Sequence, residues 1–131
     1  MSITAFRDAV VAHDHAALVE TLSPEVTFCS PAVHKPYEGR DATAFILAGV
    51  LQVFEDFRYV DELIGDGKAT LRFRARVGDR ELEGVDLLTE GDDGLISELT
   101  VLIRPLSGLQ AVVAGMEQAL REMQSQAEPA T

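Results

Sequence analysis

Apolar residues recur at helical spacing in the first part of the chain. Over residues 3–12 they fall on one side, which predicts an amphipathic helix. Asp14 is suited to cap a second, short helix that buries Leu22 and ends just before Pro24, because the residue before a proline avoids helical geometry. Residues 26–30 then alternate as a first strand.

A loop, a long helix, a meander and a last helix follow. Two prolines and a glycine make residues 31–39 a loop. Asp41 is suited to cap a helix with a broad apolar side, which should end near Phe54. Over residues 57–104 the period changes to two, in four strands separated by Gly/Asp turns, and residues 109–123 return to helical spacing.

No repeat or linker divides the 131 residues, and a hydrophobic content of 47% is typical of a globular protein. We therefore expect one domain over residues 1–124 and a flexible tail over residues 125–131. The order of elements predicts an α+β fold, because helices and a mostly antiparallel meander occupy separate parts of the chain.

The strand expected over residues 83–88 is bracketed by two turn signals. Residues 78–79 precede it and residues 91–94 follow it, so both of its neighbours should run antiparallel to it. A two-residue first turn places Arg74 opposite Glu83. Opposite charges facing each other support this register.

Asp86 is the best candidate for a functional residue. In this register it lies opposite Leu71, and a four-residue second turn places Leu99 on its other side. Its face of the sheet is otherwise apolar, with Leu71, Phe73, Ala75, Leu82, Leu88 and Leu99. Burial raises the pKa of a carboxyl and can keep it protonated as a donor, as functional sites often require. The alternative is an Asp at a strand end or cavity rim, satisfied by water or a backbone amide.

The second face of the meander is also largely apolar, and it carries Val85, Leu87, Ile96, Thr100 and Leu102. A sheet that is apolar on both sides must cover both of them. Helices can cover one face, so we expect a homodimer through the other.

Charge and composition exclude several classes of protein. A net charge of −11, from 22 acidic and 11 basic residues, repels phosphate backbones, so we expect no nucleic acid partner. One cysteine and three histidines show no zinc spacing, and we expect no metal or other cofactor. No leader and no apolar run of about 18 residues is present, so we expect a cytoplasmic protein without membrane contact.

The loop over residues 31–39 carries two further candidates. The imidazole of His34 can exchange protons near neutral pH and would serve as a base beside Asp86. The alternative is a solvent-exposed loop histidine. Tyr37 offers a ligand both a ring and a hydroxyl, or it packs the loop against the long helix.

The chain resembles the SnoaL-like branch of the nuclear transport factor 2-like superfamily, both in the order of its elements and in three short motifs. The motifs are Ser30-Pro31, the run Tyr-Glu-Gly-Arg-Asp-Ala over residues 37–42, and Val85-Asp86-Leu87-Leu88 followed by residues 93–96. This resemblance covers nearly the whole chain. It implies a cone-shaped, curved, mostly antiparallel sheet wrapped on three to four helices. The superfamily includes isomerases, polyketide cyclases, epoxide hydrolases, dehydratases and non-enzymatic binding proteins, so the fold does not fix the function.

Compared with ketosteroid isomerases, the chain keeps one of three catalytic positions. Ser30, nine residues before Gly39, stands where that family has its general-base Asp, and Phe6 stands in the slot of its oxyanion-hole Tyr. Asp86, eight residues before Gly94, matches the second donor. The two losses argue against classical steroid isomerisation. Gly84 stands where limonene epoxide hydrolases have an Arg, which argues against that chemistry too.

Three functions stay open. SnoaL-type cyclases use an Asp on this strand as acid/base, so an enzyme could use Asp86 and His34 on a small hydrophobic or polyketide-like compound. A binding module would use Asp86 to orient an apolar ligand. An interaction module would have its cone filled, whereas a cavity of about 300 Å³ or more favours the first two functions. The residues expected to line such a pocket are Phe6, Ser30, Tyr37, Phe54, Phe73 and Leu99.

Overall fold

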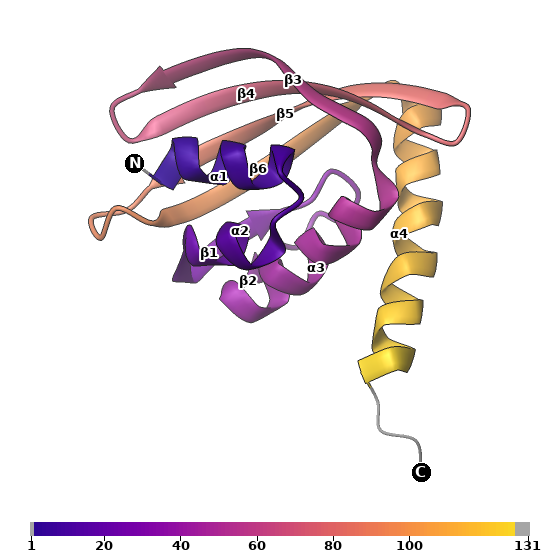
Figure 1. Cartoon of the computed structure of the whole chain (residues 1–131), viewed down its shortest axis with the longest axis horizontal. Helices are drawn as coiled ribbons and strands as arrows, with labels where there is room; N and C mark the ends of the chain where they lie inside the picture. The colour runs from indigo at the N-terminus through magenta and orange to yellow at the C-terminus, as the bar shows by residue number, and fades with distance from the viewer. Residues whose placement is uncertain (1, 128–131) are drawn as a thin grey trace.

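Within residues 2–127, which the computed structural model describes, six strands form one strongly curved sheet and four helices pack against it (Figure 1). The helices are α1 (Ser2–Val11), α2 (His15–Glu20), α3 (Arg40–Val53) and α4 (Leu106–Ala127). The strands are β1 (Leu22–Cys29), β2 (Tyr37–Glu38), β3 (Glu55–Gly65), β4 (Lys68–Val77), β5 (Arg80–Glu90) and β6 (Ile96–Arg104).

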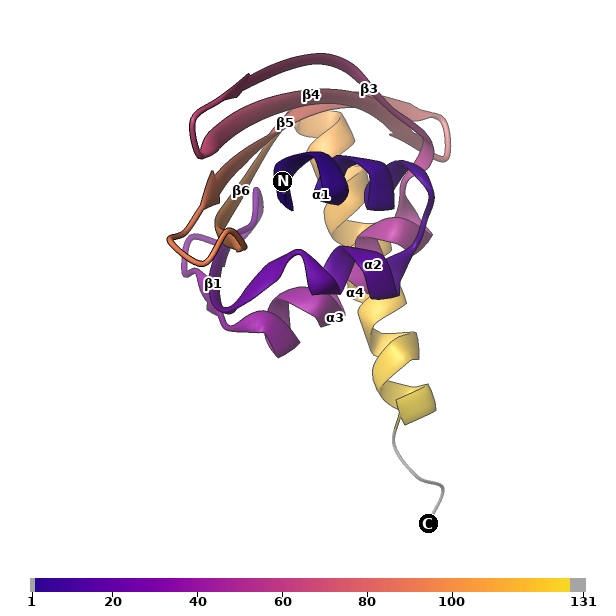
Figure 2. The ribbon, with the colours of Figure 1, turned by 60° about the vertical axis from the view of Figure 1, so that its left-hand side comes forward.

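The strands lie in the order β2-β1-β6-β5-β4-β3. Strands β3 to β6 form an antiparallel meander, and β1 runs parallel to β6 with the short β2 at the edge. Helix α1 lies beneath the arch of the meander, and α3 lies farther from the meander than α1 does. Helix α4 packs along α3 and against strands β4 to β6 (Figures 1 and 2). This is the α+β cone that the sequence predicts.

The predicted register between β4 and β5 is confirmed. Arg74 lies opposite Glu83, and Leu71 lies opposite Asp86. The cap of α2 is confirmed as well, because the side chain of Asp14 accepts a hydrogen bond from a backbone amide in the first turn. Both features are local in sequence, which is why the pattern of residues was sufficient to find them.

The predicted register between β5 and β6 is wrong by two residues. Asp86 lies opposite Val101, and Leu99 lies opposite Leu88. The loop spans residues 91–95 instead of four residues, and the strand pairing is irregular after Thr89. A shift of two preserves the face of every side chain, so Asp86 and Leu99 still share the concave side.

Three single-residue expectations are corrected by the structure. Helix α2 ends at Glu20, and Leu22 belongs to β1, where it pairs with Ile96. Ile96 is fully buried and does not lie on the outer face of the sheet. Asp41 lies in the first turn of α3, where its charge suits the helix dipole, but the N-cap residue is Gly39 at φ 97°. Long-range pairing with β6 decided the first two outcomes.

The last helix is longer than its apolar repeat indicates. It begins at Leu106 and continues to Ala127, so residues 125–127 of the expected tail belong to α4. Residues 128–131 lie outside the described residues. None of the helices described over residues 2–127 is long and apolar enough to cross a membrane.

Candidate functional site

A cavity of about 230 Å³ lies between the concave face of the sheet and helices α1, α3 and α4. Its walls are almost entirely apolar. The polar side chains that reach it are those of His13, Ser30, Tyr37, Asp86 and Glu117. His13 and Glu117 are exposed, as are Ala32 and Val33 on the loop after β1, so the cavity reaches the surface between these segments. Among the polar lining residues, Asp86 is the buried one.

Strand β5 holds Asp86 in the wall of the cavity. The residue lies between Leu71 on β4 and Val101 on β6, and only 7% of its surface is exposed. The hydroxyl of Tyr59, on β3, reaches over β4 and donates a hydrogen bond of 2.7 Å to Oδ2 of Asp86. Asp86 lines the cavity, whereas Tyr59 does not. The carboxyl of Asp86 is therefore hydrogen-bonded by Tyr59, and Asp86 itself forms part of the cavity wall.

The electrostatics of this pair follow from burial. Burial raises the pKa of the Asp86 carboxyl to about 7, although the hydrogen bond from Tyr59 acts in the opposite direction by stabilising the carboxylate. Burial and the neighbouring carboxylate raise the pKa of Tyr59 well above its ordinary value, so its hydroxyl keeps its proton. Near neutral pH, Asp86 is thus present in both its acidic and its basic form, as an efficient proton-transfer group should be.

An aromatic cluster supports both residues. The ring of Tyr59 lies edge-on to Phe57, with 5.0 Å between centroids and planes at 89°. Phe57 stacks on Phe73 at 4.9 Å, and Phe54 packs on both Phe57 and Phe73. Three of these rings line the cavity, those of Phe54, Phe57 and Phe73. The cluster fixes the ring of Tyr59 and presents a broad apolar wall to the cavity.

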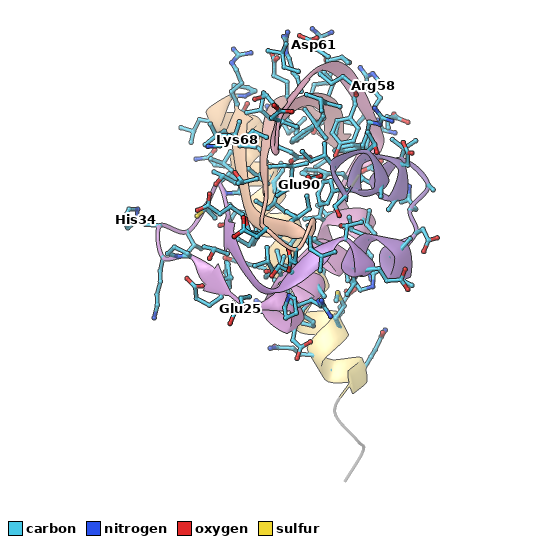
Figure 3. The ribbon with its side chains drawn as sticks, turned by 90° about the vertical axis from the view of Figure 1, so that its left-hand side faces the viewer. Glu25, His34, Arg58, Asp61, Lys68 and Glu90 are labelled. Atoms are coloured by element: carbon cyan, nitrogen blue, oxygen red, sulfur yellow. The ribbon has the colours of Figure 1, made fainter. Side chains whose placement is uncertain are left out.

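Seven of the eight site residues that the sequence singled out line this one cavity: Phe6, Ser30, Tyr37, Phe54, Phe73, Asp86 and Leu99. His34 is the exception. It is exposed at the loop after β1 and is not among the lining residues, and Figure 3 shows it pointing away from the body of the protein. The structure therefore does not bring His34 and Asp86 together. The roles of the seven residues in binding stay predictions.

Ser30 and Tyr37, the two polar residues on the wall formed by β1 and its loop, both make structural contacts. The hydroxyl of Ser30 accepts hydrogen bonds from the backbone amides of Ala32 at 3.3 Å and Val33 at 3.0 Å. The ring of Tyr37 stacks on Phe28 with 5.9 Å between centroids. Ser30 thus shapes the rim of the cavity, and Tyr37 packs the loop against the sheet.

Sequence reasoning did not place Tyr59, His13 or Glu117 at the site. Counting back from the turn between β3 and β4 would place Tyr59 opposite Arg74, but the pairing shifts between Tyr59 and Asp61, and Tyr59 lies opposite Phe73. His13 has a positive φ of 56° at the end of α1, and Glu117 lies one helical turn after Val113 on α4. No group of three metal-binding side chains occurs within residues 2–127.

Known proteins share this fold and part of this sequence. A steroid delta-isomerase from Pseudomonas aeruginosa is 38% identical with a TM-score of 0.90, over 95% of this chain and 92% of its own. An uncharacterized protein with a cystatin-like fold from Silicibacter pomeroyi is 32% identical with a TM-score of 0.85, over 89% of this chain and 83% of its own. PrhC from Penicillium brasilianum shares the fold, with a TM-score of 0.66 at 14% identity over 95% and 94% of the two chains.

No curated protein sequence matches this chain. The model of the SnoaL-like domain matches residues 3–99, which include α1 to α3, β1 to β5 and the first residues of β6. The cone with its long α3 and curved meander, and the identity to the two solved relatives, agree with that match. The chain therefore belongs to the SnoaL-like domain family, within the nuclear transport factor 2-like superfamily.

Proposed function

We propose that this protein is an acid–base catalyst of the isomerase or cyclase type, and that Asp86 is its proton-transfer group. The observation that carries this proposal is a buried carboxyl with a pKa of about 7 in the wall of an apolar cavity. Burying an ionisable group in such a place lowers stability, and proteins tolerate that cost chiefly at functional sites.

One carboxyl suffices for a proton shift. The ionised form of Asp86 takes a proton from a carbon next to a carbonyl, which leaves an enolate. The acid formed in that step returns the same proton to another atom of the substrate, so the carboxylate is regenerated and no proton is gained or lost. Asp86 is the buried titratable side chain among those that line the cavity, so the reaction is assigned to it without His34.

The size of the cavity limits the substrate. About 230 Å³ is less than the roughly 300–1,000 Å³ of sites for drug-sized ligands, and it lies below the 300 Å³ at which we expected catalysis or ligand binding to be favoured. It exceeds the roughly 150 Å³ of an apolar cavity that binds benzene. We therefore propose a substrate with one or two rings and a carbonyl, held by the aromatic wall.

The relatives support the reaction type more than the substrate. The Pseudomonas aeruginosa protein is a steroid delta-isomerase, and moving a double bond is the kind of proton shift proposed here. We do not propose a steroid as the substrate of this chain, because four fused rings exceed the volume of the cavity. In addition, Ser30 and Phe6 replace two of the catalytic residues of the classical isomerase.

Deuterium exchange tests the proposal directly. The probe is 2-tetralone, a bicyclic ketone, in deuterated buffer, and NMR measures the loss of the protons next to its carbonyl. The wild-type protein should accelerate this exchange, and Asp86→Asn should lose at least about a hundredfold, the scale of general acid–base catalysis. The matched control is Asp61→Asn, which makes the same change at an exposed position of β3 and should exchange like wild type.

A non-catalytic binding module is the second candidate, favoured by the absence of a second buried titratable side chain among the described residues of the cavity wall. Saturable binding of 2-tetralone by both the wild type and Asp86→Asn, with equally slow exchange, would establish that function and refute catalysis. Full exchange by Asp86→Asn would remove Asp86 from the mechanism.

A further inference from the structure

We propose that Tyr59 is a positioning residue that reserves one oxygen of Asp86, Oδ1, for the substrate and makes that oxygen the carrier of the exchangeable proton. The inference rests on the proposed function for its catalytic consequence. Its structural content, which oxygen of Asp86 bears the proton, stands on the geometry of the pair.

The geometry separates the two carboxyl oxygens. Oδ2 accepts the hydrogen bond of 2.7 Å from the Tyr59 hydroxyl, on the side of β3. Asp86 also contributes to the wall of the cavity, whereas Tyr59 does not. The oxygen that is not bound by Tyr59 is therefore the one that Asp86 offers to a bound molecule.

The direction of the hydrogen bond decides where the proton goes. A tyrosine hydroxyl has one proton, and here it points to Oδ2 whenever Asp86 is ionised. When Asp86 takes up a proton, an oxygen that already accepts a hydrogen bond keeps its carbonyl character, and the new proton binds to the other oxygen. Asp86 therefore receives and returns the proton through Oδ1, which faces the substrate.

Tyr59 is held in place firmly enough for this role. Its ring lies edge-on to Phe57, which stacks on Phe73, so rotation of the ring would displace the aromatic wall. Arg7 is the charged group that acts on the hydroxyl from α1, and it is itself bound by Glu62 through two hydrogen bonds of 2.9 and 3.1 Å. This ion pair ties the Arg7 guanidinium to Glu62 on β3.

The test uses the protein alone and compares two variants that each remove one hydroxyl. Tyr59→Phe removes the hydroxyl that binds Asp86, and the control Tyr37→Phe removes the hydroxyl of a lining residue on β2 that makes no hydrogen bond with Asp86. Carbon-13 labelling of the aspartate carboxyls allows NMR titration of Asp86, and Asp86→Asn identifies its signal. Infrared difference spectra report the C=O stretch of the protonated carboxyl.

Tyr59→Phe should raise the pKa of Asp86 above the wild-type value of about 7, because the hydrogen bond that stabilises the carboxylate is gone. The C=O band of the acid form should shift to higher frequency, because its carbonyl oxygen loses a donor. Tyr37→Phe should change neither. A purely packing role for Tyr59 would move neither quantity, since phenylalanine retains the ring.

Two results would overturn the inference. An unchanged pKa in Tyr59→Phe would show that the hydroxyl does not bind the carboxyl in solution. A raised pKa with an unmoved C=O band would show that the proton lies on Oδ2. Neither result bears on whether Asp86 catalyses, which the Asp86→Asn exchange assay decides separately.

A second measurement applies if Tyr59→Phe does not fold. The chain has only two tyrosines, so biosynthetic 3-fluorotyrosine in the Tyr37→Phe variant modifies Tyr59 alone. Fluorination makes the hydroxyl a stronger donor and should lower the pKa of Asp86 relative to the unfluorinated variant. An unaltered pKa would again overturn the inference.

Discussion

At the scale of single residues, the buried carboxyl of Asp86 opposes folding when it is ionised. The unfolded chain hydrates its carboxylate fully, whereas the folded protein surrounds it with leucine and aromatic side chains and supplies one hydrogen bond. The ionised form is therefore disfavoured in the folded state, and the stability of the protein depends on pH through this group.

The sign of that dependence follows from the two pKa values of Asp86, the ordinary 3.8 and about 7 in the folded protein. The folded state holds the proton of Asp86 more tightly than the unfolded state does. The stability that Asp86 contributes is therefore fully present below its unfolded pKa of 3.8, and it is lost as the pH rises through its folded pKa of about 7. The loss is at most about 4 kcal/mol. Urea unfolding of wild type and Asp86→Asn across this range should show a difference that grows toward high pH in favour of the variant.

Asp61→Asn serves as the control for this measurement, because it removes an exposed carboxylate from the same sheet. Its stability should follow that of the wild type at every pH. Parallel pH profiles of wild type and Asp86→Asn would contradict the raised pKa of Asp86.

Gly84 is a second residue whose identity is required by its surroundings. A Cβ added there would collide with the carbonyl oxygen of Leu102 and with the ring of Phe73, which forms part of the cavity wall. Gly84→Ala should lower the free energy of unfolding by about 1–3 kcal/mol, as overpacking does in other cores. Gly91→Ala is the control, because a Cβ at Gly91 meets its neighbours only at ordinary contact distances of 3.4 Å or more.

Urea denaturation of both glycine variants measures this difference. Equal stability of the two variants would show that the strands and Phe73 adjust without cost at Gly84.

At the scale of elements, α4 closes the cavity. Five of the lining residues come from this helix, although the family match ends at residue 99: Val112, Val113, Met116, Glu117 and Leu120. The start of α4 lies close against β5, because Gly108 has no side chain. A Cβ at Gly108 would lie 2.8 Å from Cβ of Leu82 and 3.0 Å from the carbonyl oxygen of Glu81.

Gly108→Ala therefore tests whether the start of α4 must pack closely against β5. An alanine stabilises an unconstrained helix by about 1 kcal/mol relative to glycine, but here the contact with β5 should reverse the sign and cost about 1–3 kcal/mol. Thermal unfolding measures the change, with Ser107→Ala, at an exposed neighbouring position, as the control. A rise in the melting temperature of Gly108→Ala would show that α4 can move away from β5 freely.

At the scale of the whole molecule, the outer face of the meander is an unpaired apolar surface. Leu63, Leu87 and Leu102 are 75%, 37% and 53% exposed on it. Arg72 and Arg104, both bound to Glu83, and Arg74 lie at one end of this face, and Glu98 and Lys68 lie at the other. A two-fold axis through the apolar centre would place the arginine end of one copy over Glu98 of the other.

We propose that a second copy of the chain covers this face, and the prediction is testable by a single charge. Leu102→Lys places a cation at the centre of the surface and should convert a dimer into a monomer in native mass spectrometry. Val11→Lys, at an exposed apolar position on α1 away from the sheet's outer face, should leave the dimer intact. A monomeric wild type, or a dimeric Leu102→Lys, would refute this interface.

The sequence by itself determined the features that depend on neighbours along the chain. The spacing of apolar residues located the four helices described over residues 2–127 and the meander, and the short Gly-Asp turn between β4 and β5 fixed the register that puts Asp86 opposite Leu71. Alternation then assigned Asp86 to an apolar face, and its burial confirms that assignment. Local chemistry was sufficient there, because turn length and side-chain period have few solutions.

The tertiary structure alone decided which polar groups meet. His34 lies in the loop between β1 and β2, is exposed, and points away from the body of the protein (Figure 3). Tyr59 reaches Asp86 from 27 residues away, across an intervening strand, and an irregularity in β3 between Tyr59 and Asp61 separates it from the turn that leads into β4. The position of Asp86 on an apolar face is therefore determined by the sequence pattern, whereas its hydrogen bond with Tyr59 is decided by the tertiary structure, because only folding brings β3 and β5 within reach of each other.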